Sequence, residues 1–273
     1  MGSYIPLGIL FALLTAIPLA LKWHLGVRRV TIAVSLLALV CSAVVCFIGR
    51  TTLLSIPART AMVWMFTVGI ALLILLYRFY RDPERTPPPN SADTVVSPAD
   101  GVVIYIRESK DGKLPVSTKQ TNKYELIELT KTSLEFTEAL VVGIRMNLLD
   151  VHVTRTPIDG HIVSQRHYPG TFGSLRRSEM VFRNERATTV IERNGMQAAV
   201  VHIASRLVRQ IAIFVHEGQS VAMGQRLGII RFGSQVDLVL SRRNDLRVTA
   251  QVGQQVRAGE SIVAVIEAQS LCR

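Results

Sequence analysis

The chain of 273 residues has little cysteine, few aromatic side chains and, over its first 77 residues, no Asp or Glu at all. Its three cysteines are Cys41, Cys46 and Cys272; two lie within an apolar run and one lies at the tail. This number and spacing exclude a disulfide framework and offer no metal-binding pattern, so we expect no metal. Aromatic residues make up only 6% of the chain, whereas 49% of it is hydrophobic.

The charge is basic throughout. The formal net charge is +11, with five basic residues in 1–77 and a net of +6 in the remainder. Such a chain fits contact with anionic lipid, where each basic group contributes about 1 kcal/mol. A basic isoelectric point that is common among membrane proteins explains the charge equally well. No nucleic-acid-binding motif accompanies the charge, so we expect no nucleic-acid partner.

Three uncharged apolar runs open the chain: Ile5–Leu21, Val30–Ile48 and Ala61–Tyr77. At about 1.5 Å per residue, each helix would just cross a thin hydrocarbon core. We therefore predict about three transmembrane helices in residues 1–78, with two spans and an interfacial helix as the alternative. A proline-rich juxtamembrane linker follows in residues 79–93, and a second, more polar domain occupies residues 94–273.

Basic residues in the loops predict the orientation. Three follow the first run, two follow the second and three follow the third (Lys22, Arg28 and Arg29; Arg50 and Arg59; Arg78, Arg81 and Arg85). The positive-inside rule then puts the large domain in the cytoplasm, by a margin of one charge between the two loops.

The polar part contains short β-branched runs between turn residues, which is typical of a mainly β domain. The expected strands are Val95–Val96, Val102–Ile106, Ala139–Met146, His161–Ser164, Thr188–Glu192, Gln197–Ile203, Leu227–Arg231, Val236–Leu240 and Ile262–Ile266. Ser205–Arg209 is compatible with a short helix. We assign no role to residues 109–138.

Two internal echoes indicate a repeated architecture. The pattern Gly-Gln-x-Val-x-x-Gly occurs in His216–Gln225 and again, 35 residues later, in Gln251–Glu260. A Pro-x-Asp-Gly turn occurs at Pro98–Gly101 and at Pro157–Gly160. The first echo resembles the hammerhead-type barrel of biotinyl and lipoyl carrier domains, so we expect a barrel-sandwich domain.

A Gly233-Ser234 pair lies between two of the expected strands. Alone, it is a common turn dipeptide. A serine held in a strained turn can instead direct its hydroxyl at the preceding carbonyl, a geometry suited to self-cleavage.

The surrounding residues resemble the phosphatidylserine decarboxylase family, in its shorter form with a single Gly-Ser pair. Five blocks carry the resemblance in the family's order: Phe79–Arg85 (FYRDPER), Ser97–Gly101 (SPADG), Asp150–Val153 (DVHV), Tyr168–Phe172 (YPGTF) with Asn184–Arg186 (NER), and Ile230–Asp237 (IRFGSQVD).

The resemblance implies that Ser234 attacks the Gly233 carbonyl and that the chain splits into 1–233 and 234–273, which stay associated. Ser234 then becomes a pyruvoyl group, which is the cofactor, forms a Schiff base with the substrate amine and accepts electrons as CO2 leaves. No metal is required by this chemistry.

His152 is the expected base for the Ser234 hydroxyl, since a histidine titrates near neutral pH. Asp100 is expected to orient it, completing an Asp-His-Ser arrangement. An outward-facing histidine and a simple Asp-Gly turn are the structural alternatives. Asp150 is expected to be a local cap or turn residue.

Some relatives have His-x-x-His in the DVHV block, whereas Arg155 stands at the second position here. Arg155 is thus a candidate to hold a substrate carboxylate or phosphate, and His167 is a weaker substrate-binding candidate. Asn184–Arg186 would form a solvated turn, a buried hydrogen-bond network or a substrate contact. The other histidines, His24, His161, His202 and His216, belong to no motif and are taken as incidental.

The resemblance thus implies an integral enzyme of the cytoplasmic membrane that converts phosphatidylserine to phosphatidylethanolamine. A homodimer is compatible with the sequence. Two alternatives remain open. One is a decarboxylase of a serine ether lipid of the archaeal type; the other is a non-catalytic membrane protein that uses the barrel as an interaction module.

Overall fold

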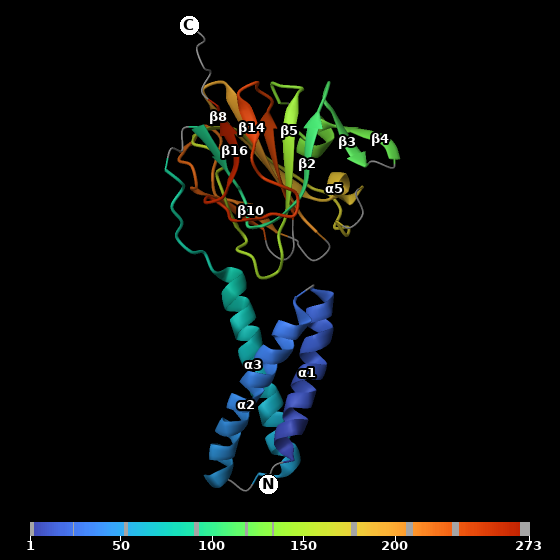
Figure 1. The fold of residues 1–273 in the computed structure, drawn as a ribbon, viewed down its shortest axis with the longest axis vertical. Coiled ribbons are helices and arrows are strands. Elements are labelled where there is room, and N and C mark those ends of the chain that lie inside the picture. The colour runs from blue at the N-terminus through green and yellow to red at the C-terminus, as the bar shows by residue number, and fades with distance from the viewer. Residues whose placement is uncertain are drawn as a thin grey trace. The chain divides into compact units, whose positions relative to one another are not determined.

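The computed structural model describes residues 3–23, 25–51, 54–89, 93–117, 120–132, 134–175, 179–205, 210–230 and 235–267. Within them the chain forms two compact units, a helical unit that ends at Tyr80 and a β-rich unit that begins at Arg81 (Figure 1). The predicted class, an N-terminal set of apolar helices followed by a mainly β domain, is confirmed.

Three helices make up the first unit: α1 (Tyr4–Lys22), α2 (Val27–Thr51) and α3 (Ile56–Tyr80). Each is long and apolar enough to cross a membrane. Many of their large apolar side chains are exposed, among them Leu14, Phe47 and Leu73. Exposed apolar surface on this scale is stable in lipid and not in water.

Small residues and a few polar contacts hold the three helices together. A side chain at Gly8 of α1 would collide with Val63 of α3, so glycine permits the close approach of these helices. The indole N–H of Trp64 in α3 donates to the Thr15 hydroxyl of α1 at 3.1 Å. Arg59 donates to the Gly49 carbonyl at 3.1 Å, which satisfies one of the orphan carbonyls in the last turn of α2.

The β unit is built on one antiparallel sheet of eight strands, in which every hydrogen-bonded pair is antiparallel. Its central strand β13 lies between β9 and β5. The strands, in spatial order, are β11 (Ser220–Val221), β7 (Gly160–Tyr168), β8 (Arg186–Arg193), β9 (Met196–Ile203), β13 (Gln235–Ser241), β5 (Ala139–Arg145), β2 (Gly101–Ser109) and β15 (Gln255–Val256).

Two three-stranded sheets and one hairpin complete the unit. The first small sheet is β1 (Thr94–Val96), β16 (Ile262–Ile266) and β14 (Leu246–Val248), and the second is β10 (Ile211–Ile213), β12 (Arg226–Ile230) and β6 (Val153–Arg155). The hairpin joins β3 (Lys113–Ser117) and β4 (Gln120–Glu125). The short helices are α4 (Leu126–Thr130) and α5 (Met180–Arg183).

The eight-stranded sheet has a core on each face, because side chains alternate along its strands. In β13, Val236, Leu238 and Leu240 belong to the inner core, which also includes residues of both small sheets. Val239 belongs to the outer core, which includes Leu126 and Leu129 of α4 and Phe182 of α5.

The two sequence echoes occupy equivalent places. Val221 of β11 pairs with Gly160, and Val256 of β15 pairs with Gly101, so each Gly-Gln repeat lies against one Pro-x-Asp-Gly turn. A side chain at Gly101 or Gly160 would collide with the carbonyl oxygen of Arg145 or Glu192 respectively. The repeat is therefore structural, and it relates the two edges of the large sheet.

All nine expected strands are present in the described residues, with ends that shift by up to four residues. Strands β3, β4, β6, β10, β11, β14 and β15 were not predicted. Most of these strands have two or three residues, too few for an alternating pattern to be visible. The helix considered for Ser205–Arg209 falls on residues that lie outside the described part, apart from Ser205.

Candidate active site

The predicted cleavage pair, Gly233-Ser234, lies outside the described residues, but both of its flanks are described. Strand β12 ends at Ile230 in a three-stranded sheet, and β13 begins at Gln235 in the eight-stranded sheet. The four residues 231–234 therefore connect two different sheets. The predicted cofactor residue is in this connection, and its role stays a prediction.

His152 lies directly beside the start of this connection. The N–H of Ile230, the last residue of β12, donates to the His152 carbonyl at 3.2 Å. The next pair of the ladder is Ile229 with Val153. His152 is 0% exposed, so the alternative of an outward-facing histidine is wrong.

The ring of His152 is held in one tautomer. Its Nδ1 lies 2.8 Å from the Asp150 carbonyl oxygen, which only accepts hydrogen bonds, so Nδ1 carries the hydrogen. In the neutral ring, Nε2 is then the basic nitrogen. Burial lowers the pKa of His152 to about 4, although the bond to Asp150 and the charge of Asp100 oppose the shift. The ring is therefore neutral at physiological pH and able to accept a proton.

Asp100 is part of a buried clamp. It forms a bidentate ion pair with Arg85, with Nη1–Oδ1 at 2.5 Å and Nη2–Oδ2 at 2.9 Å. The carboxylate also accepts the N–H of Ala258 at 2.8 Å and that of Val151 at 3.4 Å. Val151 precedes His152, so the clamp fixes the backbone that carries the histidine. Orientation of the His152 ring by Asp100 stays a prediction.

The equivalent turn in the other half is different. Asp159 pairs with Arg193 at 2.7 Å, and its side chain is half exposed. The side chains of Asp100 and Arg85, by contrast, are 9% and 6% exposed. The same four-residue turn thus holds an ordinary surface pair in one half and a buried ion pair in the other.

Arg155 is buried, and both terminal nitrogens of its guanidinium already have partners. Its Nη1 donates to the Gly224 carbonyl at 2.8 Å, and its Nη2 donates to the Pro83 carbonyl at 2.9 Å and to Asp82 at 3.3 Å. Asp82 also pairs with Arg226. Arg155 of β6 therefore fastens the first residues of the β unit, Asp82 and Pro83, to its strands, and these contacts leave it less available for a substrate anion.

His167 lies on the surface of β7. Its Nε2 is 2.8 Å from Oε1 of Glu185, and its side chain is 48% exposed. His167 is in register with Ala187 of β8, which is in register with His202 of β9 and then with Val236 of β13. Three strand spacings separate His167 from β13, roughly 14 Å along the sheet.

The Asn184–Arg186 block forms a buried hydrogen-bond network, one of the three expected alternatives. The Asn184 amide bonds to both the N–H and the carbonyl of Gly173, at 2.7 and 2.8 Å. Arg186 is 1% exposed and donates to the carbonyls of Glu128, Leu129, Val181 and Asn184. Asp150 forms the expected turn by accepting the Asn147 N–H at 2.7 Å.

One polar contact in the inner core has no counterpart among the predicted site residues. His202 is fully buried, and its Nε2 lies 2.8 Å from the Thr154 hydroxyl. Thr154 also donates to the Gly228 carbonyl of β12 at 3.1 Å. His202 belongs to an otherwise apolar strand and Thr154 follows the His152 block by one residue, so neither carries a motif of its own.

A second buried polar cluster lies on the outer face of the same sheet. Asp237 accepts the Tyr105 hydroxyl at 2.6 Å and the Gln235 amide at 2.8 Å. Burial raises the pKa of Asp237 to about 6, although its hydrogen bonds and the charges of Arg107 and Arg186 oppose the shift. Asp237 is the last residue of the IRFGSQVD block, but its burial could not be predicted from that block.

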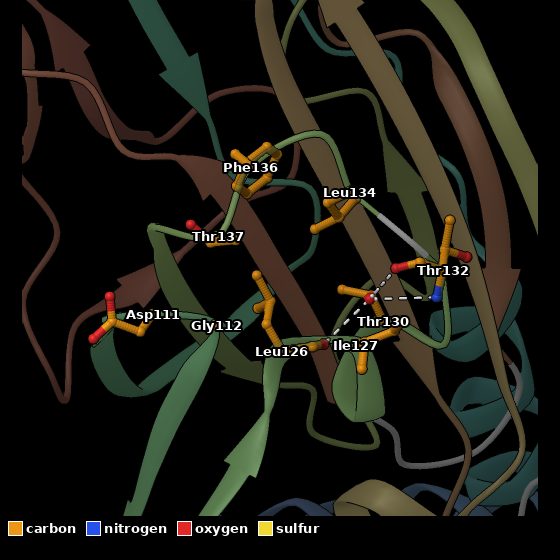
Figure 2. A pocket seen from close by; sticks show the side chains of 9 residues that line it. All are labelled: Asp111, Gly112, Leu126, Ile127, Thr130, Thr132, Leu134, Phe136 and Thr137. Carbon is orange, nitrogen blue, oxygen red and sulfur yellow. Dashed lines mark hydrogen bonds between the residues drawn. The ribbon is translucent and has the colours of Figure 1, made fainter.

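A cavity of about 310 Å³ lies elsewhere, lined by residues of the segment 109–138, to which we assigned no role from the sequence. Figure 2 shows Leu126, Leu134 and Phe136 around this space, with Thr130 and Thr132 hydrogen-bonded beside it. Of the predicted site residues that the structure describes, Asp100, His152, Arg155 and His167, none lines it. Among the described residues, no group of three or more His, Cys, Asp or Glu side chains is placed to hold a metal ion.

Comparison with known proteins agrees with the resemblance. The family model described as phosphatidylserine decarboxylase matches residues 72–264. The "Phosphatidylserine decarboxylase proenzyme" of Pelobacter propionicus is 35% identical over 75% of this chain and 83% of that protein. The protein of the same name from Mycolicibacterium vanbaalenii is 32% identical over 80% of this chain and 85% of its own.

An archaeal protein is similar to the same degree. The "Putative archaetidylserine decarboxylase proenzyme" of Methanocaldococcus jannaschii is 36% identical over 73% of this chain and 94% of that protein. With a family model that matches most of the chain and relatives above 30% identity that are covered over 83–94% of their length, this chain belongs to the phosphatidylserine decarboxylase family.

Proposed function

We propose that this chain is a self-maturing, pyruvoyl-dependent decarboxylase that converts phosphatidylserine to phosphatidylethanolamine and CO2. The observation that carries the proposal is the state and position of His152. It is a buried, neutral imidazole with Nε2 as its basic nitrogen, and its backbone is hydrogen-bonded to the last residue before the 231–234 connection. Family membership supplies the reaction class.

In the proposed maturation, the Ser234 hydroxyl attacks the Gly233 carbonyl carbon while His152 Nε2 takes the hydroxyl proton. The peptide C–N bond breaks, the Ser234 nitrogen becomes a free amine, and an ester joins Gly233 to the serine oxygen. Loss of the Ser234 α-proton then expels the Gly233 carboxylate and leaves dehydroalanine at position 234. Addition of water and loss of ammonia convert that residue to a pyruvoyl group.

The residues described around the connection fit this group. His152 is neutral, its tautomer is held by Asp150, and the Arg85–Asp100 pair fixes the preceding residue. When formed, the pyruvoyl group supplies a carbonyl that takes up the substrate amine and an electron sink for the departure of CO2. The chain's own contribution is a positioned, buried base, and general acid–base catalysis contributes about 10²–10⁴-fold.

A membrane substrate matches the helical unit. The three apolar helices hold the enzyme in the bilayer, where its lipid substrate resides. We further propose that the β unit faces the cytoplasm, because the stretch between the first two uncharged apolar runs carries one more basic residue than the stretch between the second and third. Labelling of single cysteines introduced in the two loops, in right-side-out vesicles, tests this orientation.

A serine ether lipid of the archaeal type is the second candidate substrate. The observation in its favour is the similarity to proteins named as archaetidylserine decarboxylase proenzymes, at 36% and 34% identity. Both candidates present the same phosphoserine head group to the site. An assay with the purified enzyme and each lipid in matched micelles separates them by relative kcat/KM.

Mass spectrometry of the purified full-length chain tests the maturation. The expected products are 1–233 and 234–273, the latter beginning with a pyruvoyl group that reacts with hydroxylamine. The Ser234→Ala variant is expected to stay one chain. A wild-type chain that remains intact, or a Ser234→Ala chain that still divides at Gly233, contradicts the proposal.

A further inference from the structure

A buried hydrogen bond between two side chains joins two sheets across the mainly apolar inner core of the β unit. His202 comes from β9 of the eight-stranded sheet, and Thr154 comes from β6 of the small sheet. Both residues are 0% exposed. A polar group costs free energy when it is buried unless it is hydrogen-bonded, so a polar contact between two sheets in this core calls for an explanation.

The Thr154 hydroxyl is the centre of this contact. It donates to the Gly228 carbonyl at 3.1 Å, which leaves its oxygen to accept the hydrogen on Nε2 of His202 at 2.8 Å. The result is a continuous chain of hydrogen bonds from β9 through β6 to β12. We call these three residues, His202, Thr154 and Gly228, the inter-sheet tie.

The inter-sheet tie links β12, where the connection 231–234 begins, to β9, which pairs with β13 where that connection ends. Gly228 lies two residues before the end of β12 at Ile230. His202 is directly opposite Val236, the second residue of β13. The tie therefore holds the end of β12 and the start of β13 at a set separation, and residues 231–234 must span that separation.

His152 belongs to the same assembly. It is two residues before Thr154, and the Ile230 N–H donates to its carbonyl. The other groups that raise or lower the pKa of His152 are Asp150 and Asp100, and neither contacts the tie through any hydrogen bond recorded in the described residues. Loss of the tie would therefore leave these contacts of His152 in place while the start of β13 shifts relative to it.

We propose that His202 and Thr154 are positioning residues for the self-cleavage at Gly233-Ser234. The inference rests on the proposed function. The tie acts through geometry: it sets the two strand ends so that the serine hydroxyl, the preceding carbonyl and His152 meet. Misplacement of reacting groups by about 1 Å costs on the order of 100-fold in rate, so a small shift of one sheet has a large effect.

The test follows cleavage of the newly made full-length chain in lipid nanodiscs, by pulse-labelled cell-free synthesis. The rate of appearance of fragment 234–273 is measured in the fraction that resists limited proteolysis, so that only folded molecules count. Thr154→Val removes the hydroxyl at nearly constant shape, and His202→Phe removes the imidazole. Each is expected to slow cleavage at least tenfold. Thr154→Ser keeps the hydroxyl and is expected to restore most of the rate.

Thr188→Val is the matched control. Thr188 is also fully buried in the eight-stranded sheet, and its hydroxyl donates to the Thr130 carbonyl at 2.6 Å, away from the inter-sheet tie. It is expected to cleave at the wild-type rate. Folded Thr154→Val and His202→Phe chains that cleave as fast as wild type overturn this inference alone, as does an equal slowing in Thr188→Val. A wild-type chain that never cleaves overturns the proposed function as well.

Discussion

Arg85 and Asp100 face each other across a buried bidentate ion pair, at 2.5 and 2.9 Å, beneath the backbone that leads into His152. Arg85 also donates to the Ala258 carbonyl at 2.7 Å, and Asp100 accepts the Ala258 N–H. Burial disfavours the charged form of Arg85, but the hydrogen bonds and charge of Asp100 outweigh it and raise the pKa of the guanidinium. One ion pair thus joins three distant segments of the chain.

We expect Arg85→Gln to destabilise the β unit. Removal of one partner of a buried pair leaves an uncompensated charge, which costs about 3–5 kcal/mol. The measurement is the thermal unfolding midpoint in detergent. Cleavage at Gly233 is expected to slow in the same variant, because the residue before His152 loses its anchor.

Asp100→Asn removes the other partner of the buried pair, and Asp159→Asn is its matched control. Asp159 has the same turn and an arginine partner, but its side chain is 50% exposed. Exposed pairs contribute about 0–1 kcal/mol, so the midpoint should hardly move. Equal losses in Asp100→Asn and Asp159→Asn would show that burial of the first pair has no energetic consequence.

The pH dependence of self-cleavage should report the unusual state of His152. Its pKa is lowered to about 4, mainly by burial, so the basic form persists down to about pH 5. We expect a cleavage rate that is level above about pH 5 and falls at lower pH with a midpoint near 4. An ordinary histidine would give a midpoint near about 6.5.

The rate is measured by quenching the pulse-labelled precursor after transfer to each pH. His152→Gln should be slower by about 10²–10⁴-fold and lose the midpoint. A midpoint that stays unchanged in this variant would assign the titration to another group.

Arg186 is expected to be a stability residue and not a substrate contact. Its guanidinium donates to four backbone carbonyls, including two at the end of α4, and burial lowers its pKa to about 10. Arg186→Met leaves those carbonyls unsatisfied and should cost about 3 kcal/mol or more in unfolding free energy. Arg247→Met, which removes an exposed pair with Glu267, should cost less than about 1 kcal/mol.

Asp237→Asn is expected to stabilise the protein at neutral pH. The pKa of Asp237 is raised from 3.8 to about 6. Between these two pH values the folded state therefore keeps a proton on Asp237 that the unfolded state has already released. Stability from this group is therefore full at low pH and is lost as pH rises from about 4 to 6. At pH 7 the buried charge costs up to about 3 kcal/mol, which the amide removes.

The comparison of Asp237→Asn with wild type isolates this effect. His152 and His202 act with the opposite sign: their lowered pKa values, about 4, remove stability as pH falls below about 6.5, equally in both proteins. The difference in unfolding midpoint should therefore be largest near pH 7 and vanish near pH 4. A constant difference across this range would contradict a buried charge at Asp237.

The helices and the long strands could be predicted from sequence because their patterns extend over many residues. The three apolar runs became α1, α2 and α3, and the run Ile262–Ile266 became β16 with the same bounds. The Gly-Gln repeat correctly predicted that its two copies occupy equivalent places in the fold. Each copy contains a turn with positive φ, at Gly218 and at Gly253, a conformation that favours glycine.

The partners of individual side chains could not be predicted in the same way. Arg155 carries the chemistry of an anion-binding residue, but its neighbours Asp82 and Pro83 precede it by more than 70 residues. His202 follows a run of apolar residues and has no motif, so only the packing of β9 against β6 reveals its bond to Thr154. Contacts between distant segments depend on topology, which a local pattern does not contain.

Strand β13 is paired over seven residues with β5 and over six with β9, in the middle of the large sheet. A cut before Gln235 would leave this strand, together with β14, β15 and β16, on a separate polypeptide. The precursor folds as one molecule, whereas the mature protein, once denatured, would have to reassemble from two. Refolding would then depend on protein concentration, so maturation would change the molecularity of folding and make the loss of structure effectively irreversible in dilute solution.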